Sequence, residues 1–238
     1  MAQHSPLPKW RGADRKAMKK IDIKKLLKTF VYILFPVIGG SMVGVSCSEE
    51  TEESSEFDNW QARNETFFAS LEDSLSKSPT QWLKLKNYSL DATTEGTTGD
   101  YVYAKVISSG TGTDSPMFTD SLRLSYEGRL IPSATYPAGY IFDGTAYGTY
   151  NDATNATTKM VMVQSGYEAL IPGWITALLH MHRGDHWRVY IPQQLAYGSD
   201  DKTSDGIPPY STLIFDITLV DFSPAGEVMP AWSARQMR

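Results

Sequence analysis

The chain has 238 residues, of which 41% are hydrophobic and 21% charged, a balance that is ordinary for a globular protein. Residues 1–46 carry nine Lys and Arg against two Asp, whereas the remaining residues carry 13 basic and 25 acidic side chains. The acidic body argues against a nucleic-acid partner, which would need a basic face, and the single cysteine, Cys47, excludes an intrachain disulfide.

The head of the chain has the order of a targeting segment. A Lys-rich stretch begins at Met18, an apolar run follows from residue 29 to 46, and small residues then lead to Cys47. We therefore predict that residues 1–46 are an upstream extension and a signal peptide, with Met18 as a plausible start. The apolar run reaches the lower edge of transmembrane length, so an uncleaved anchor is the alternative.

This segment resembles a bacterial lipoprotein signal peptide, in which the final Cys is lipidated. The hydrophobic residue usual three positions before the Cys is displaced here to Val43. The tract "SEETEE" after Cys47 is similar to the surface-export signal of Bacteroidetes lipoproteins. The resemblance implies an exported protein whose lipidated Cys47 anchors it to the outer membrane of a Gram-negative bacterium, facing the periplasm or the surface.

Residues 47–99 are predicted to be an acidic tether, a helix and a linker. In "FDNWQARNETFFASLEDSLSKS", Trp60, Phe67, Phe68 and Leu71 recur at helical spacing, and Asp58 can cap the start. This pattern predicts one helix of about five turns over residues 57–78. The Gly- and Thr-rich stretch "SLDATTEGTTGD" then reads as a linker.

From residue 100 the pattern favours strands. We predict strands in "YVYAKVISSG", "DSLRLSYEGRL", "MVMVQS", "HWRVYIP" and "TLIFDITLVDF", and a long loop in "IFDGTAYGTYNDATNATTK". The stretch "YEALIPGWITALLHM" is the only convincing helix of this half, with Trp174, Leu178 and Met181 on one face. The fold class is therefore α+β, with the body at residues 100–223 and a tail at 224–238.

The sequence contains no phosphate loop, no GxSxG elbow, no HExxH and no paired-Cys motif. It contains instead an ordered series of aromatic and apolar motifs: "SYEG", "FDG", "ALIPGW", "LAYG" and "GIPPYSTLIFD". Taken singly, each aromatic residue is best read as a core residue, and the Asp of "FDG" as a turn carboxylate.

These motifs resemble the FKBP family of peptidyl-prolyl cis-trans isomerases. "DSLRLSYEGRL" is similar to the family strand that ends in HYxGxL, and "IFDGT" to its FDSS. "LIPGWITALLHMHRGDHWRVYIPQQLAYG" follows VIxGWxxxLxxMxxGxxxxxxIPxxxAYG nearly position for position, and "GIPPYSTLIFDITLVDF" follows xIPPxxTLxFxVxLxxF. The resemblance covers about residues 100–222 and is closest to Bacteroides-type FKBP lipoproteins.

The resemblance implies a twisted antiparallel sheet wrapped around one short helix, preceded here by the N-terminal helix and the signal peptide. It also implies a proline pocket. The catalytic residues would be Trp174 as the floor, Tyr126 as a wall, Asp143 as a carboxylate aimed into the pocket, and Tyr197 as a hydroxyl donor. The substrate-binding residues would be Phe142, Phe215, Leu170, Ile171 with its backbone N–H, Ile207 at the far rim, and Val161 where the family usually has another aromatic residue.

The implied function is isomerisation of X–Pro bonds in exported proteins, which needs no cofactor and no metal. The implied partners are proline-containing polypeptide clients, macrolide ligands and a membrane reached through the lipid. The alternative is a non-catalytic FKBP-like binding module. Expanded loops at residues 131–141 and 144–160 flank the expected pocket mouth, so they could set specificity or partly block the pocket.

The stretch "HMHRGDH" holds three of the four histidines of the chain. A metal site is the obvious hypothesis, but residues two apart on a helix point about 200° from one another, so His180 and His182 cannot chelate one ion there. The family pattern places Gly184 at the turn after the helix, where positive φ is useful. We therefore expect a surface turn and no metal site.

Overall fold

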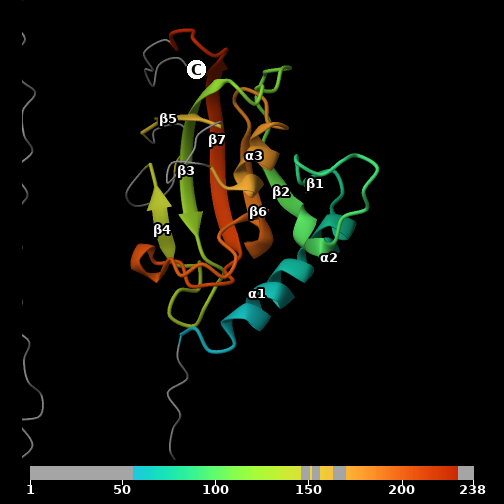
Figure 1. Cartoon of the computed structure of the whole chain (residues 1–238), viewed down its shortest axis with the longest axis vertical. Coiled ribbons are helices and arrows are strands. Elements are labelled where there is room, and N and C mark those ends of the chain that lie inside the picture. Colours follow the sequence, from blue (N-terminus) through green and yellow to red (C-terminus); the bar gives the residue numbers. More distant parts are fainter. Residues whose placement is uncertain (1–55, 146–150, 152–155, 163–169, 230–238) are drawn as a thin grey trace, which may run out of the picture. The chain divides into compact units, whose positions relative to one another are not determined.

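The computed structural model describes residues 56–145, 151, 156–162 and 170–229 (Figure 1). The predicted signal peptide, Cys47 and most of the C-terminal tail lie outside the described residues. Within the described part, no helix is both long and apolar enough to cross a membrane.

An antiparallel sheet dominates the described part of the chain (Figure 1). Its strands are β1 (Trp82–Lys86), β2 (Tyr101–Ser108), β3 (Ser121–Arg129), β4 (Ile141–Gly144), β5 (Thr158–Val161), β6 (His186–Ile191) and β7 (Leu213–Ser223). The strand order is β1-β2-β6-β7-β3-β4, and β5 also pairs with β3. Short 3₁₀ turns occupy Thr98–Asp100, Gln193–Leu195 and Thr203–Asp205.

The long strand β7 lies at the centre of the sheet, between β6 and β3. Its alternating residues Leu213, Phe215, Ile217 and Leu219 are all buried, as the period-two pattern of the sequence predicts. The opposite face of β7 is buried as well, because Asp216 and Thr218 are almost inaccessible to solvent. The Asp216 carboxylate on this second face pairs with the guanidinium of Arg188 on β6.

The short helix α3 (Pro172–Leu178) packs against β2 and β6 (Figure 1). It begins at Pro172 because the proline ring fixes a helical φ and the first turn needs no N–H from this residue. Trp174, Leu178 and Met181 are buried as predicted, but Met181 lies after the end of α3, and residues 173–178 are buried on every side of the helix. The α+β class, with an antiparallel sheet around one short helix, is therefore confirmed.

The N-terminal helical segment is present, but it is not one helix. It consists of α1 (Trp60–Ala69) and α2 (Leu71–Lys77), which are separated at Ser70. The Ser70 hydroxyl donates to the Phe67 carbonyl at 2.6 Å, a local bond that competes with the helical ladder. The predicted cap is also wrong: Asn59 holds the N-cap position, with φ of 52° and no side-chain cap bond.

Two short strands lie where the sequence predicted none. Strand β1 falls in the segment expected to hold the tether, helix and linker, and it pairs with β2 along its whole length. Strand β4 falls at the start of the predicted long loop and pairs with β3. The predicted strand "MVMVQS" begins two residues early, at Thr158 in β5, and its last residues lie outside the described ranges.

Candidate active site

A cavity of about 110 Å³ opens beside the start of α3. Strands β3, β4, β5 and β7 and the loop after β6 contribute the other walls. The lining residues are Tyr126, Phe142, Asp143, Met160, Leu170, Ile171, Trp174, Tyr197 and Phe215. The structure thus brings together the predicted pocket residues from five separate segments of the chain, with two exceptions described below.

Aromatic rings in edge-to-face contact form the buried side of the cavity. Trp174 is only 4% exposed, and its ring centroid lies 5.0 Å from that of Phe215 and 5.1 Å from that of Tyr126. Phe142 meets Phe215 at 5.6 Å with an interplanar angle of 87°. Such T-shaped arrangements are the favoured geometry for aromatic pairs, so the rings hold one another in place.

Gly128 on β3 allows these rings to approach the sheet. A Cβ atom at this position would lie 2.5 Å from Phe215 Cε1 and 2.8 Å from Phe142 Cε2. In the sheet register Gly128 pairs with Phe215 on one side and with Asp143 on the other. The glycine of the "SYEG" motif therefore leaves the space that the walls of the cavity fill.

The polar wall of the cavity is the pair Tyr126 and Asp143. The Tyr126 hydroxyl donates to Asp143 Oδ2 at 2.8 Å, and Asp143 Oδ1 accepts the Gly144 N–H at 2.8 Å. Burial, and then the hydrogen bond and negative charge of Asp143, raise the pKa of Tyr126. The backbone beyond the pair is fixed by Thr145, whose N–H donates to the Tyr126 carbonyl at 2.9 Å.

Tyr197 and Ile171 contribute hydrogen-bond donors at the border of the cavity. Burial, and then the charges of Asp143 and Asp205, raise the pKa of Tyr197, so its hydroxyl keeps its proton at neutral pH. Within the described residues, neither this hydroxyl nor the Ile171 N–H makes a hydrogen bond. Both donors are therefore available to a ligand, and Tyr197 is 38% exposed.

Two predicted site residues do not line the cavity. Met160 lines it in place of Val161, because Met160 pairs with the inward-facing Leu122 and successive strand residues point to opposite faces. Ile207 is buried in the main core, and its N–H donates to the Lys202 carbonyl at 3.0 Å. Met160 was missed because "TKMVMV" is apolar on both faces, so its sequence cannot fix the register.

The three clustered histidines interact with separate partners. His180 Nδ1 lies 2.8 Å from the Thr176 carbonyl oxygen, and His182 Nδ1 lies 3.3 Å from Asp185 Oδ2. His186 lies on β6, 3.8 Å from Asp216. In the described ranges no three His, Cys, Asp or Glu side chains are grouped so as to hold a metal ion.

Comparison with known proteins identifies the family of this domain. Residues 112–220 match the family model described as FKBP-type peptidyl-prolyl cis-trans isomerase. The chain is 34% identical over 117 residues to the FKBP-type 22 kDa peptidyl-prolyl cis-trans isomerase of Escherichia coli, a match that covers 49% of this chain and 48% of that protein. It is 34% identical over 121 residues to the outer membrane protein MIP of Legionella longbeachae, covering 51% of this chain and 44% of that protein.

Solved structures include a peptidyl-prolyl cis-trans isomerase from Pseudomonas syringae, with a TM-score of 0.48 and 24% identity over 71% of this chain and 97% of that one. The chain spans about half the length of the curated relatives named above. The matched region contains the whole aromatic cavity, from Tyr126 to Phe215. Residues 112–220 therefore belong to the FKBP-type peptidyl-prolyl cis-trans isomerase family.

Proposed function

We propose that this chain is a peptidyl-prolyl cis-trans isomerase that binds the twisted X–Pro amide in the cavity above Trp174. The observation that carries the proposal is the aromatic cavity itself, with the Tyr126–Asp143 hydrogen bond in its wall. Membership of residues 112–220 in the isomerase family supports it.

The chemistry suits an apolar cavity. Rotation about an X–Pro bond has a barrier of about 18–20 kcal/mol, which arises from amide resonance. The twisted transition state has lost this resonance and is less polar at the amide than the planar ground state. A cavity walled by Trp174, Phe142 and Phe215 therefore binds the twisted state better than the hydrated planar one. A ~10⁶-fold acceleration requires only about 8 kcal/mol of such differential binding.

Hydrogen bonds would orient the substrate in this cavity. The Ile171 N–H and the Tyr197 hydroxyl are donors without a partner in the described part of the chain, and both border the apolar space. Each can donate one hydrogen bond to a substrate carbonyl oxygen beside the rotating bond. Asp143, held by Tyr126, places a carboxylate beside the amide that rotates. No nucleophile and no proton transfer is needed.

A protease-coupled assay on a short X–Pro peptide tests this proposal. The wild-type chain should accelerate the slow cis-to-trans phase, and Asp143→Ala should reduce kcat/KM because the Tyr126 hydroxyl loses its acceptor. Asp114→Ala is the matched control, since Asp114 is exposed and does not line the cavity. No acceleration by the wild type, with Asp143→Ala changing nothing, would contradict the proposal.

A binding module without catalysis is the second candidate, and one observation favours it. Met160, not an aromatic residue, lines the side of the cavity contributed by β5. Methionine is flexible and adapts to varied ligands, which suits a pocket retained for recognition. Such a module would bind proline-containing peptides and leave their rate of isomerisation unchanged.

We also propose that the clients are exported proteins and that a lipid on Cys47 anchors the chain to the outer membrane. The basic and apolar head that ends at Cys47 supports this proposal. In a bacterial host, labelled palmitate should be incorporated into the wild type and not into Cys47→Ser, and globomycin should block the processing of the wild type. Equal labelling of both proteins would overturn the lipid anchor.

A further inference from the structure

One segment beside the proposed active site has a strained backbone. Residues 208–212 connect the loop that contains Tyr197 to β7, which carries Phe215. Tyr210 in this segment has φ of +61°, a left-handed conformation that is unusual for a residue other than glycine. Such a conformation is energetically costly for a side chain with a Cβ and persists only when the surrounding structure enforces it.

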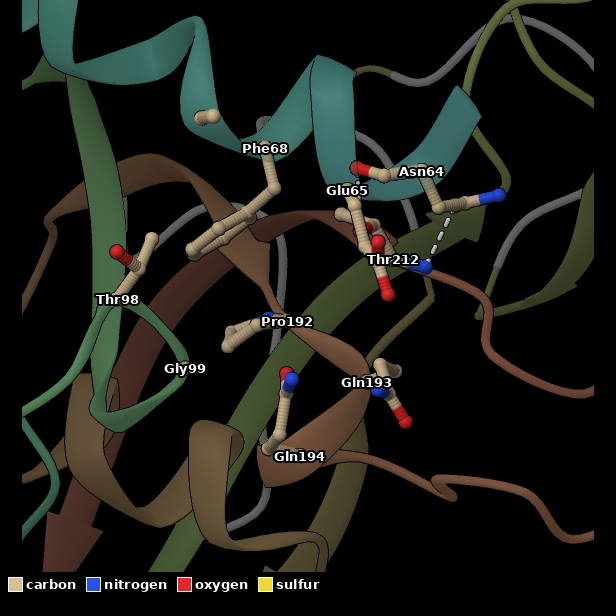
Figure 2. Close-up of a pocket in the computed structure, with 10 residues that line it drawn as sticks. Asn64, Glu65, Phe68, Thr98, Gly99, Pro192, Gln193, Gln194 and Thr212 are labelled. Atoms are coloured by element: carbon tan, nitrogen blue, oxygen red, sulfur yellow. Dashed lines mark hydrogen bonds between the residues drawn. The ribbon is translucent and has the colours of Figure 1, made fainter. Parts of the chain in front are cut away.

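Helix α1 supplies contacts that hold this segment. The indole Nε1–H of Trp60 donates to Ser211 Oγ at 2.9 Å, and the Ser211 hydroxyl in turn donates to the Pro208 carbonyl at 2.6 Å. Asn64 Oδ1 accepts the Thr212 N–H at 2.7 Å, a bond drawn in Figure 2.

The bonds between α1 and this segment are shielded from water. Trp60, Asn64, Ser211 and Thr212 are each 6% exposed or less. Asn64 is itself fixed, because its Nδ2–H donates to the Trp60 carbonyl at 2.8 Å. Figure 2 shows Asn64 extending from α1 toward Thr212 at one side of a cavity of about 250 Å³, which α1 shares with residues 98–99 and 192–194. Breaking a buried bond of this kind leaves a desolvated polar group without a partner.

The held segment connects directly to the active site. The Tyr210 N–H donates to the Gly198 carbonyl at 2.7 Å, and Gly198 follows Tyr197 in the chain. Gly198 itself has φ of +58°, a left-handed conformation that glycine adopts without strain. A continuous series of bonds therefore runs from α1 through residues 208–212 to the backbone that carries the Tyr197 hydroxyl.

We infer that Trp60 and Asn64 are positioning residues for Tyr197, although α1 lies outside the family-matched residues 112–220. This inference rests on the proposed isomerase function. Tyr197 would contact the substrate in its planar and twisted forms alike, so loosening its support weakens binding more than it slows rotation. The expected signature is a raised KM with kcat little changed.

Trp60→Phe in the full chain tests the inference, because it removes the indole N–H and keeps an aromatic ring. Ser211→Ala removes the same bond from its other end. Each variant should raise KM by roughly 5- to 10-fold and leave kcat within about twofold. The KM of the double variant should be no higher than that of the more impaired single variant. Adding Tyr197→Phe to either single variant should raise KM little further.

Trp82→Phe is the matched control. Trp82 is a buried tryptophan on β1 that stacks on Tyr190 at 5.4 Å and makes no bond to residues 208–212. It should lower the Tm and leave KM unchanged at temperatures well below the Tm. If Trp82→Phe raises KM as much as Trp60→Phe does, the effect is one of general stability, and the inference is overturned.

Amide hydrogen exchange gives a readout that does not need activity. The Tyr210 N–H should exchange faster in Trp60→Phe than in the wild type, and at the wild-type rate in Trp82→Phe. Unchanged Tyr210 exchange and unchanged KM in Trp60→Phe would overturn the inference while leaving the proposed function intact. A wild-type chain that is inactive would overturn the proposed function, and with it the role of Trp60 and Asn64 in catalysis.

Discussion

At the scale of single residues, the Tyr126 hydroxyl is a polar group in the wall of the cavity. It donates to Asp143, and its ring packs edge-on against Trp174. Burial and the Asp143 carboxylate raise its pKa above the usual 10.0, so the hydroxyl stays protonated throughout the neutral range. Titration of Tyr126 should therefore not change the rate of isomerisation near pH 7.

Tyr126→Phe tests the value of this hydroxyl. Removing the donor leaves the Asp143 carboxylate free to move and to take up water at the cavity wall, so kcat/KM should fall about 10-fold for loss of one hydrogen bond to a charged group. The peptide assay measures this loss. Tyr88→Phe is the control, because Tyr88 is an exposed tyrosine that stacks on Phe118 and does not line the cavity. An equal loss in both variants would contradict the assigned role.

Asp216, on the opposite face of β7, should make the stability of the fold depend on pH. Arg188 Nε and Nη2 each lie 3.0 Å from one of its two oxygens, and its side chain is almost fully buried. Burial raises the pKa of Asp216, but the neighbouring His186 ring and the Arg188 guanidinium outweigh burial, so the net effect is a lowered pKa. The folded state therefore binds a proton less readily here than the unfolded state.

The sign of the pH dependence follows from that difference. The stabilisation by Asp216 is complete above its unfolded-state pKa of about 3.8 and is lost as the pH falls through the lower folded-state value. Urea unfolding between pH 7 and pH 3 should show a smaller loss of stability in Asp216→Asn than in the wild type. Asp114→Asn is the control, because Asp114 is an exposed carboxylate far from the Arg188–Asp216 pair in the chain. Parallel pH curves for wild type and Asp216→Asn would refute the assignment.

At the scale of elements, the contact between α3 and β6 fixes the floor of the cavity. Gly173 precedes Trp174, and a Cβ on Gly173 would lie 2.2 Å from Ile191 Cγ2. The helix thus lies directly on the strand, and any side chain at Gly173 forces the two apart. Trp174 would move with the helix.

Gly173→Ala should destabilise the fold by about 1–3 kcal/mol, the usual cost of overpacking. Calorimetry or denaturant unfolding measures this cost. Ile191→Ala removes the atom that the new Cβ would meet, so the double variant should lose less stability than the two single losses added together. Strict additivity would show that the close approach of α3 and β6 is not the cause.

The sequence predicts the elements whose pattern is long and regular. Strands β2, β3, β6 and β7 alternate over six or more residues, and the motif "LIPGW" marks the start of α3. Most of the cavity follows from the motifs and from the family that they resemble. The strands β1 and β4, which the sequence did not predict, have five and four residues, too few for a period to stand out.

The sequence could not show features that depend on tertiary contacts. Met160 and Val161 are both apolar, and only the pairing of β5 with β3 decides which of them faces the cavity. The role of α1 depends on the bonds from Trp60 and Asn64 to residues about 150 positions away. Helical periodicity predicts an apolar face for α1 and gives no information about its partner.

At the scale of the whole molecule, the N-terminal helices are part of the body. Trp60 joins the same buried core as Trp174 and Phe215, and Phe68 packs with Tyr103 of β2. The expanded loop at residues 131–141 reaches the same region, where Thr135 Oγ1 donates to Glu56 Oε2. None of the residues of this loop lines the cavity.

Exchange spectroscopy on a short X–Pro peptide tests the central claim most directly, because it measures the rate of cis–trans exchange at equilibrium. A substoichiometric amount of the wild-type chain should increase the exchange rate and leave the ratio of cis to trans unchanged, as a catalyst must. If the peptide binds and its exchange rate stays at the uncatalysed value, the cavity recognises proline without rotating it. That result would contradict the isomerase function.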